Sequence, residues 1–287
     1  MSDRPAFDPV RFKQVQRESW SAAAPAWEKW WSMFDAGGQP IADRLVNLAR
    51  VGEGSRVLDI ATGPGEPAVT AARAVGPSGR VLATDHSPEM IAAAMRRAAA
   101  LGLKNVEYRV VDAEALDVGE TGFDAVLCRW GLMFVADLEA TVAGIAKMLR
   151  KGGWFATSVW ATADKVPMIS LASEDVRKVA NVPPPPPGTP NPLALADSSV
   201  LSNALTRAGF HDIEIEREIV HFEFDSPEAF LECRRDMSVT FRTMLNALPA
   251  DKQKQVCDLV LQGARRYADS SGHVITPNEA IIFAAHI

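Results

Sequence analysis

A short glycine-rich segment is the part of this sequence whose residue types are best suited to binding a ligand. Residues 59–65 read DIATGPG, with Gly63 and Gly65 shortly after a run of apolar residues. A strand that runs into glycines and then a helix places open backbone N–H groups beside a ligand at the edge of a sheet. Asp59 precedes these glycines, so its carboxylate can accept a hydrogen bond from a bound amine or position the loop.

Two further acidic residues follow later apolar runs in the same way. Asp85 comes about 20 residues after the loop, where nucleotide-binding folds present a carboxylate to ribose hydroxyls. Asp112 follows a third apolar run, where a carboxylate can accept a hydrogen bond from the exocyclic amine of adenine. Acids at three consecutive strand ends suit a ribose, an adenine and a cation, and they do not make a pyrophosphate site.

A dinucleotide site is the alternative reading of this loop. The pattern Gly63-x-Gly65-x-x-Ala68 also fits the dinucleotide-binding fingerprint, so the loop alone is weak evidence. An NAD(P)-dependent oxidoreductase would use the loop and Asp85. It would leave Asp59 and Asp112 without a role.

The elements that must position these residues alternate along the chain. Short β-rich runs are separated by helical stretches, which is the pattern of βαβ units around a parallel sheet. The predicted strands cover residues 56–60, 80–84, 106–111, 123–128 and 154–160, and the predicted helices cover 66–75, 87–101 and 138–149.

After residue 160 the alternation breaks, and two helical insertions are predicted at about 163–196 and 225–271. The first contains Pro183–Pro187, which indicates a stiff spacer or, less favourably, a docking site for a partner that recognises proline. A helix over 198–208, a strand near 213–216 and a last strand over 280–285 complete the pattern. The domain organisation predicted is a helical N-terminal arm or lid over 1–50 and one α/β domain over 51–287.

Composition limits the classes of partner. The 287 residues include 36 acidic and 30 basic side chains, a formal charge of −6, so no basic field favours nucleic acid. The three cysteines have no metal-binding or redox spacing, so no metal is predicted. The N-terminal sequence has no apolar signal region, and no uncharged run is long enough to span a bilayer. We therefore expect a cytoplasmic protein.

Residues 57–160 resemble the class I S-adenosylmethionine-dependent methyltransferases, in particular the ubiquinone/menaquinone-biosynthesis type. The glycine motif of that family matches Asp59, Gly63 and Gly65, with Ala61 in place of its first glycine. Further matches are Phe123-Asp124, the turn over 149–153 and the turn over 208–210. The resemblance implies a doubly wound, mostly parallel, seven-stranded Rossmann-like sheet with an antiparallel last strand. It also implies S-adenosylmethionine as the cofactor.

The resemblance assigns cofactor contacts to specific positions. Asp85 and Asp112 could instead be helix or turn caps, His86 an exposed loop residue, and Cys128 a buried packing residue. The cofactor-binding residues implied are Asp59, Ala61, Thr62, Gly63, Gly65, Asp85, His86, Met90, Asp112, Ala113 and Cys128.

Aromatic residues concentrate in the N-terminal arm. Pro25 is predicted to open a helix that places Trp27, Trp30/Trp31 and Phe34 on one aromatic face. This face packs on the domain, shields cofactor and acceptor, or does both. The acceptor-binding residues predicted are Trp20, Trp27, Trp31, Arg129, Trp130, Met133 and Arg234.

Arg234 belongs to the second insertion. Asp225 and Glu228 are spaced as a capping box, and an apolar stripe over 230–248 follows with Arg234 within it. A buried guanidinium needs a partner. It could pair with Glu232 or Asp236, extend its head to the rim, or bind an anionic group of the acceptor.

No general base is evident. His221 and Tyr267 are weak candidates because they lie in or beside the second insertion. Many methyl transfers need only proximity and desolvation, so a missing base does not exclude activity.

The function predicted is methyl transfer by SN2 displacement to a small, largely apolar or aromatic acceptor under a helical lid. The alternatives are the oxidoreductase, a nucleotide-binding protein without catalysis, and a methyltransferase for a macromolecule. The sequence leaves a homodimer open, and it leaves the acceptor and its methylated atom undetermined.

Overall fold

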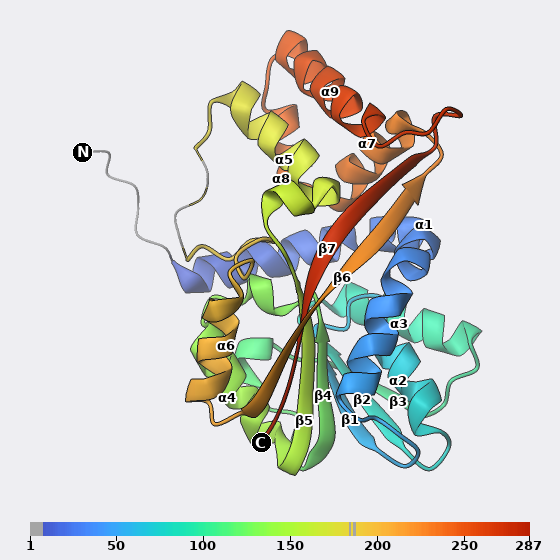
Figure 1. Ribbon diagram of the computed structural model, residues 1–287, viewed down its shortest axis with the longest axis vertical. Helices are drawn as coiled ribbons and strands as arrows, with labels where there is room; N and C mark the ends of the chain where they lie inside the picture. The colour runs from blue at the N-terminus through green and yellow to red at the C-terminus, as the bar shows by residue number, and fades with distance from the viewer. Residues whose placement is uncertain (1–7, 184, 186–187) are drawn as a thin grey trace.

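A seven-stranded sheet forms the centre of the protein, whose computed structural model describes residues 8–183, 185 and 188–287. The strand order is β3-β2-β1-β4-β5-β7-β6 (Figure 1). Strands β1 to β5 pair in parallel, and β7 runs antiparallel to both β5 and β6, which confirms the predicted fold class. The strands are β1 Arg56–Ile60, β2 Arg80–Asp85, β3 Val106–Val110, β4 Phe123–Arg129, β5 Leu149–Trp160, β6 His211–Phe224 and β7 Val274–His286.

Helices cover both faces of this sheet, with α2 and α3 on one side and α4 and α6 on the other (Figure 1). The central strands are therefore continuous apolar runs, as parallel strands buried on both faces require. Phe123 and Phe155 are fully buried in this core. The helices are α1 Pro9–Leu48, α2 Ala68–Val75, α3 Pro88–Ala100, α4 Leu138–Met148, α5 Pro167–Ala180, α6 Ser198–Arg207, α7 Pro227–Met237, α8 Val239–Asn246 and α9 Ala250–Arg265.

The N-terminal arm is one long helix, so the prediction that a helix opens at Pro25 is wrong. α1 begins at Pro9, where the Asp8 side chain accepts hydrogen bonds from the first-turn N–H groups. Pro25 and Pro40 lie inside it. Each proline removes one backbone hydrogen bond and bends the helix without ending it. The bent α1 crosses the molecule and then continues beside α3 (Figure 1).

Strands β6 and β7 are much longer than the predicted segments 213–216 and 280–285. They form a long antiparallel pair, joined through the second insertion, in which His211 pairs with His286 and Phe224 pairs with Val274. β6 is an edge strand with charged, exposed residues such as Glu214 and Glu218 along its first half. An edge strand that is solvated on one face lacks the continuous apolar run of a central strand. The sequence pattern therefore predicted only a short part of β6.

The second insertion also differs in detail from its prediction. Ser226, rather than Asp225, caps α7, because its Oγ accepts the N–H of Ala229 at 3.1 Å. The apolar stripe over 230–248 is divided by a break at Ser238, which caps α8. In the first insertion, the proline run Pro183–Pro187 falls partly outside the described residues, so its role as a spacer stays a prediction.

Helices α5, α7, α8 and α9 gather at one end of the sheet, beside the end of β6 and the start of β7 (Figure 1). We call these four helices the cap helices. They pack on one another, and α7 also packs against α1. The arm and the cap helices are therefore joined by direct contacts.

Two adjacent glycines let α1 approach the sheet. A Cβ atom added to Gly37 would lie 2.6 Å from the ring of Phe222, and one added to Gly38 would lie 2.7 Å from Arg129 Nη1. Glycine within a helix costs about 1 kcal/mol relative to alanine. The close approach of α1 to β6 and to the end of β4 explains why glycine stands here.

We expect Gly37→Ala to lower the free energy of unfolding by about 1–3 kcal/mol, despite the better helix propensity of alanine, because the methyl group overlaps β6. Urea unfolding of the variant measures this change. Gly52→Ala is the control, since a Cβ atom there meets nothing within 4 Å and should change stability by less than about 0.5 kcal/mol. Equal stability of Gly37→Ala and the wild type would contradict the close packing.

Candidate functional site

The glycine loop lies at the carboxyl end of β1 and is fixed by two buried carboxylates. Asp59 Oδ2 accepts the N–H of Ala68 at 3.0 Å, which ties the end of β1 to the first turn of α2. Asp85, at the end of β2, accepts the N–H of Gly63 on one oxygen and that of Ser87 on the other, each at 2.9 Å. The structure thus brings these predicted residues together and gives both acids a structural role.

Backbone conformation explains the glycines of this loop. Gly63 and Gly65 have φ angles of 54° and 112°, and Ala61 adopts a φ of 55°. This left-handed region costs an L-residue about 1–2 kcal/mol, so glycine is the favoured residue at position 61. A Cβ atom on the facing Gly131 would lie 2.7 Å from the Ala61 methyl group. Ala61 is thus a strained residue at a strand end, a feature that recurs at functional sites.

The predicted adenine side lies beside β2 and β3. Met90 is buried under Ala23 and Ala24 of α1. Asp112 Oδ1 accepts the N–H of Glu114 at 2.9 Å, while its Oδ2 lies 2.5 Å from Lys13 Nζ. His86 and Ala113 are half-buried at the same strand ends. The start of α1 therefore reaches the carboxylate at the end of β3.

A buried ionic network that the sequence did not reveal links the loop to the arm. Arg97 of α3 lies 2.6 Å from Asp35 of α1 and 2.9 Å from Glu66, which directly follows the glycine loop. Thr70 Oγ1 donates to Glu66 at 2.7 Å. The only sequence signal was a basic residue among the alanines of α3. Arg97 connects three segments that are distant in sequence.

Burial shapes the protonation of the groups near the loop. Burial raises the pKa of Asp59 to about 8 and that of Tyr108 to about 12. A hydrogen bond from the Thr62 side chain opposes the rise in pKa at Asp59. Tyr108 OH and Arg97 Nε are buried with no hydrogen-bond partner in the described part of the chain. Buried polar atoms without partners are uncommon and point to a missing water or ligand.

The acceptor-side residues lie at the carboxyl ends of β4 and β5. Burial raises the pKa of the Cys128 thiol to about 12, so this cysteine is a packing residue and not a thiolate nucleophile. Arg129 is buried, donates to the carbonyl of Gly38 at 3.2 Å and lies over the Trp130 ring. Trp130 stacks on Trp160 with a centroid separation of 4.3 Å. Met133 is 2% exposed directly after this strand.

Trp27, Trp30, Trp31 and Phe34 all lie on the half-buried or buried side of α1, as predicted, while positions 28, 29 and 32 are exposed. The contacts of the three tryptophans differ. Trp27 packs on Phe34 at 4.7 Å and on Trp20 at 6.4 Å. Trp31 lies under the guanidinium of Arg97 at 4.3 Å. Trp30 packs on Phe224 and donates its indole N–H to Asp236 at 2.9 Å.

Arg234 is buried, but neither predicted acidic partner contacts it. Glu232 and Asp236 instead pair with Lys29 of α1, at 2.7 Å and 2.6 Å. Arg234 is 8% exposed, and its Nε has no hydrogen-bond partner within the described ranges. The interpretation of an internal ion pair with Glu232 or Asp236 is therefore wrong.

The two candidate bases lie apart from the loop. His221 is exposed on β6, next to Phe222, whose side chain points to the buried face. Tyr267 lines an open cleft of about 700 Å³ between α5 and the end of α9. The structure does not bring either side chain to the loop, so we assign neither as a base. The other residues of this cleft are Ala163, Asp164, Ser170, Leu171, Glu174 and Arg266.

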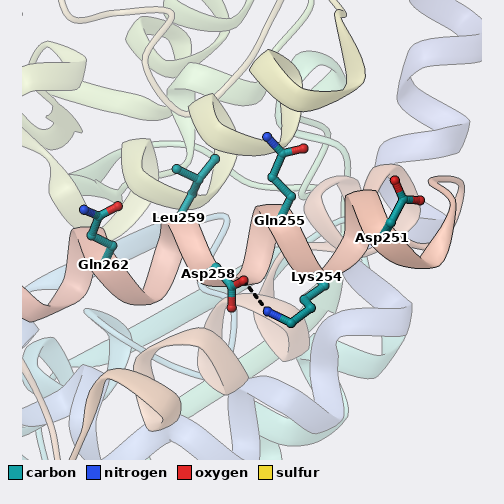
Figure 2. Close-up of a pocket in the computed structure, with 6 residues that line it drawn as sticks. All are labelled: Asp251, Lys254, Gln255, Asp258, Leu259 and Gln262. Carbon is teal, nitrogen blue, oxygen red and sulfur yellow. Dashed lines mark hydrogen bonds and ion pairs between the residues drawn. The ribbon is translucent and has the colours of Figure 1, made fainter.

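A smaller hollow of about 280 Å³ lies along α9 (Figure 2). All of its lining residues belong to this single helix, and Lys254 pairs with Asp258 across it. No other helix or strand contributes a side chain to the lining of this hollow, so we do not propose it as a site. Within residues 8–183, 185 and 188–287, no group of side chains could hold a metal ion, and no helix is both long and apolar enough to cross a membrane.

Residues 57–153 match the family profile described as a methyltransferase domain. The chain contains a methyltransferase domain of the S-adenosylmethionine-dependent class. The match covers the glycine loop and the ends of β1 to β4, and it confirms the family resemblance and the cofactor class that the sequence predicted.

Similar proteins carry the same domain. Aklanonic acid methyltransferase DauC of a Streptomyces species is 36% identical over 114 residues, which cover 40% of this chain and 52% of that protein. The ubiquinone/menaquinone biosynthesis C-methyltransferase UbiE of Pseudomonas putida is 35% identical over 109 residues, which cover 38% of this chain and 43% of that protein. The chain thus matches about half the length of these relatives, in the methyltransferase domain.

A solved structure extends the likeness in fold to nearly the whole chain. Phosphoethanolamine N-methyltransferase 2 of Haemonchus contortus, in complex with S-adenosylhomocysteine, aligns with a TM-score of 0.60 and 19% identity. The alignment covers 96% of this chain and 59% of that one. At this identity the likeness shows the fold of the methyltransferase domain.

The raised pKa of Asp59 predicts a dependence of stability on pH. An acid with a higher pKa in the folded state than its usual 3.8 binds its proton more tightly when folded, so stability falls as pH rises from about 4 to about 8. Asp59→Asn removes this loss and still offers an oxygen to Ala68. We expect its free energy of unfolding to rise relative to wild type across this range, by about 1 kcal/mol or more at pH 8.

Urea unfolding of both proteins at several pH values measures this difference. Asp117→Asn is the control, because Asp117 also accepts a single backbone N–H, from Gly119, but on the exposed surface. Its curve should stay parallel to that of the wild type. Parallel curves for Asp59→Asn would show that the Asp59 carboxyl is not perturbed.

Proposed function

We propose that this chain transfers a methyl group from S-adenosylmethionine to a small, largely apolar or aromatic acceptor enclosed by α1 and the cap helices. The observation that carries the proposal is the glycine loop held by Asp85, with further carboxylates at the ends of β1 and β3, inside a methyltransferase domain. A parallel α/β sheet binds ligands outside the carboxyl ends of its strands, which is where these groups lie.

The residues present fit S-adenosylmethionine. Asp59 and Thr62 supply polar side chains beside the loop, and the space above Gly63 is open because an added Cβ atom there meets nothing within 4 Å. Asp85 would hold the ribose hydroxyls and Asp112 the adenine amine. When bound, the cofactor supplies a methyl group activated by a sulfonium. The remaining residues proposed to contact it are Ala61, Gly65, His86, Met90, Ala113 and, through its backbone, Cys128.

The acceptor would lie against the aromatic groups at the ends of β4 and β5. Trp20, Trp27, Trp130 and Met133 supply apolar walls, and α1 and the cap helices exclude water. Exclusion of water favours an SN2 transfer, because the charge of the sulfonium is dispersed in the transition state, and enclosure aligns the acceptor with the methyl group. One similar protein is named for an organic acid and another for ubiquinone and menaquinone biosynthesis, which supports a small acceptor.

Catalysis in this proposal rests on positioning and desolvation. Cys128 stays protonated and His221 is exposed, so neither is placed as a proton acceptor. The buried ionic network around Arg97 would keep the glycine loop and α1 in fixed relative positions while the acceptor is enclosed. A cytoplasmic location and a homodimer stay predictions.

Calorimetric titration with S-adenosylmethionine, S-adenosylhomocysteine and NADH tests the cofactor. We expect the first two to bind and NADH to stay silent. Asp85→Asn should weaken the binding at least tenfold, because hydrogen bonds to a charged carboxylate contribute about 1.5–3 kcal/mol. Asp124→Asn is the matched control, since Asp124 also accepts a backbone N–H, from Arg56, but near the start of β4. Binding of NADH alone would favour an oxidoreductase.

The ion pair between Lys13 and Asp112 predicts competition between the arm and adenine. Lys13→Met should tighten binding of S-adenosylmethionine by up to about fivefold at low salt, because an exposed pair contributes about 0–1 kcal/mol and must open before adenine can use Asp112. The gain should vanish at 1 M salt. Lys104→Met, which alters an exposed lysine, should have no effect. Weaker binding by Lys13→Met at low salt would show that Lys13 assists the cofactor instead.

A further inference from the structure

Arg234 of α7 is a buried cation for which the described chain provides no anion. Its side chain is 8% exposed, its Nε has no hydrogen-bond partner, and burial lowers its pKa. A guanidinium removed from water without a partner destabilises a protein strongly. Such a group is retained at a binding site when a ligand supplies the missing partner.

The acids of the same helix are all engaged elsewhere. Glu232 and Asp236 pair with Lys29 of α1, and Glu228 lies 3.7 Å from Arg265 of α9. Residues two positions away in a helix point in nearly opposite directions, so Glu232 and Asp236 lie on the other side of α7 from Arg234. No rearrangement of the helix surface brings these carboxylates to the buried guanidinium.

The neighbours of Arg234 place it on the inner side of the cap helices. One turn before it, Phe230 packs on Phe224 of β6 with ring centroids 5.2 Å apart. Five residues after it, Val239 packs against the buried group of Ala23, Ala24 and Met90, together with Trp27. α7 therefore packs against β6, and the start of α8 that follows it packs against the residues beside the proposed cofactor site.

Two further buried N–H donors lack acceptors in this part of the molecule. Trp27 Nε1 and Trp130 Nε1 have no hydrogen-bond partner among the described residues. A chain of ring contacts joins them, because Trp27 packs on Phe34, Phe34 on Phe222 and Phe222 on Trp130, at 4.7, 5.0 and 6.4 Å. Guanidinium and indole groups donate hydrogen bonds and do not accept them. Each of these groups can therefore pair only with an acceptor atom.

We propose that Arg234 binds an anionic oxygen of the acceptor, so that the acceptor is an aromatic acid. The carboxylate or phenolate oxygen is the group recognised, and the aromatic rings around it hold the apolar body. This inference rests on the proposed function, because it specifies the acceptor of that reaction. Arg suits it because its planar fork matches two oxygens of a carboxylate.

Binding of 1-naphthoate and of its neutral amide, 1-naphthamide, tests the inference. Both are titrated calorimetrically into the full chain in the presence of saturating S-adenosylhomocysteine. Wild type should bind the carboxylate at least tenfold more tightly than the amide. Arg234→Met should lose at least tenfold in affinity for the carboxylate and keep its affinity for the amide. Arg235→Met is the matched control, since Arg235 is the exposed neighbour on the same helix.

The thermal midpoint of Arg234→Met gives an independent readout. Without ligand, the variant should be as stable as wild type or more stable, because it no longer buries an unpaired charge. If Arg234 instead supports the fold, the midpoint falls and the inference is overturned.

The remaining outcomes separate this inference from the proposed function. If S-adenosylhomocysteine binds but wild type shows no preference for the carboxylate over the amide, the anion site is wrong and the methyltransferase stands. Equal affinities of Arg234→Met and wild type for naphthoate would have the same meaning. Failure to bind S-adenosylhomocysteine overturns the proposed function itself, and this inference with it.

Discussion

The hydrogen bonds that Asp85 accepts from Gly63 and Ser87 are the interactions on which the rest of the site depends. They fix the glycine loop of β1 to the end of β2, and they set the start of α3 at the same point. Both carboxylate oxygens still have lone pairs free for a ligand. The group that shapes the loop is thus the group proposed to bind ribose. A change at this residue affects the loop and the ligand together.

Buried charge connects this loop to the arm that covers it. Arg97 bridges Asp35 of α1 and Glu66 of the loop, and the Gly37–Gly38 pair lets the same helix lie against β6 and the end of β4. Ionic and apolar contacts therefore both hold the arm against the sheet domain. The cap helices pack on the arm in turn, and Lys29 of α1 pairs with two acidic residues of α7. This layering is the basis of the proposal that a small acceptor is enclosed here.

The sequence predicted the central strands and the loop well because local pattern determines them. Strands β1 to β4 begin and end within a residue of their predicted limits, since buried parallel strands are continuous apolar runs. β6 was underestimated because its exposed edge carries charged residues that obscure the apolar positions. The helix start at Pro25 was wrong because proline tolerates a helix interior when packing compensates for the lost hydrogen bond.

Contacts between distant segments could not be predicted in this way. Arg97 lies 62 residues from Asp35 and 31 from Glu66 along the chain, so no local spacing marks the network. The apolar stripe correctly indicated that Arg234 is buried, but its partner depended on where Lys29 of α1 would lie. Long-range packing thus decides which charges are paired and which remain for a ligand.

Hydrogen–deuterium exchange of the wild-type chain with and without S-adenosylmethionine tests the central claim most directly. We expect slower exchange in residues 59–65, 85–90 and 112–114, the three strand ends that carry the loop and the carboxylates, and no such protection with NADH. Protection by NADH at these segments, or none by S-adenosylmethionine at saturating concentration, would contradict it.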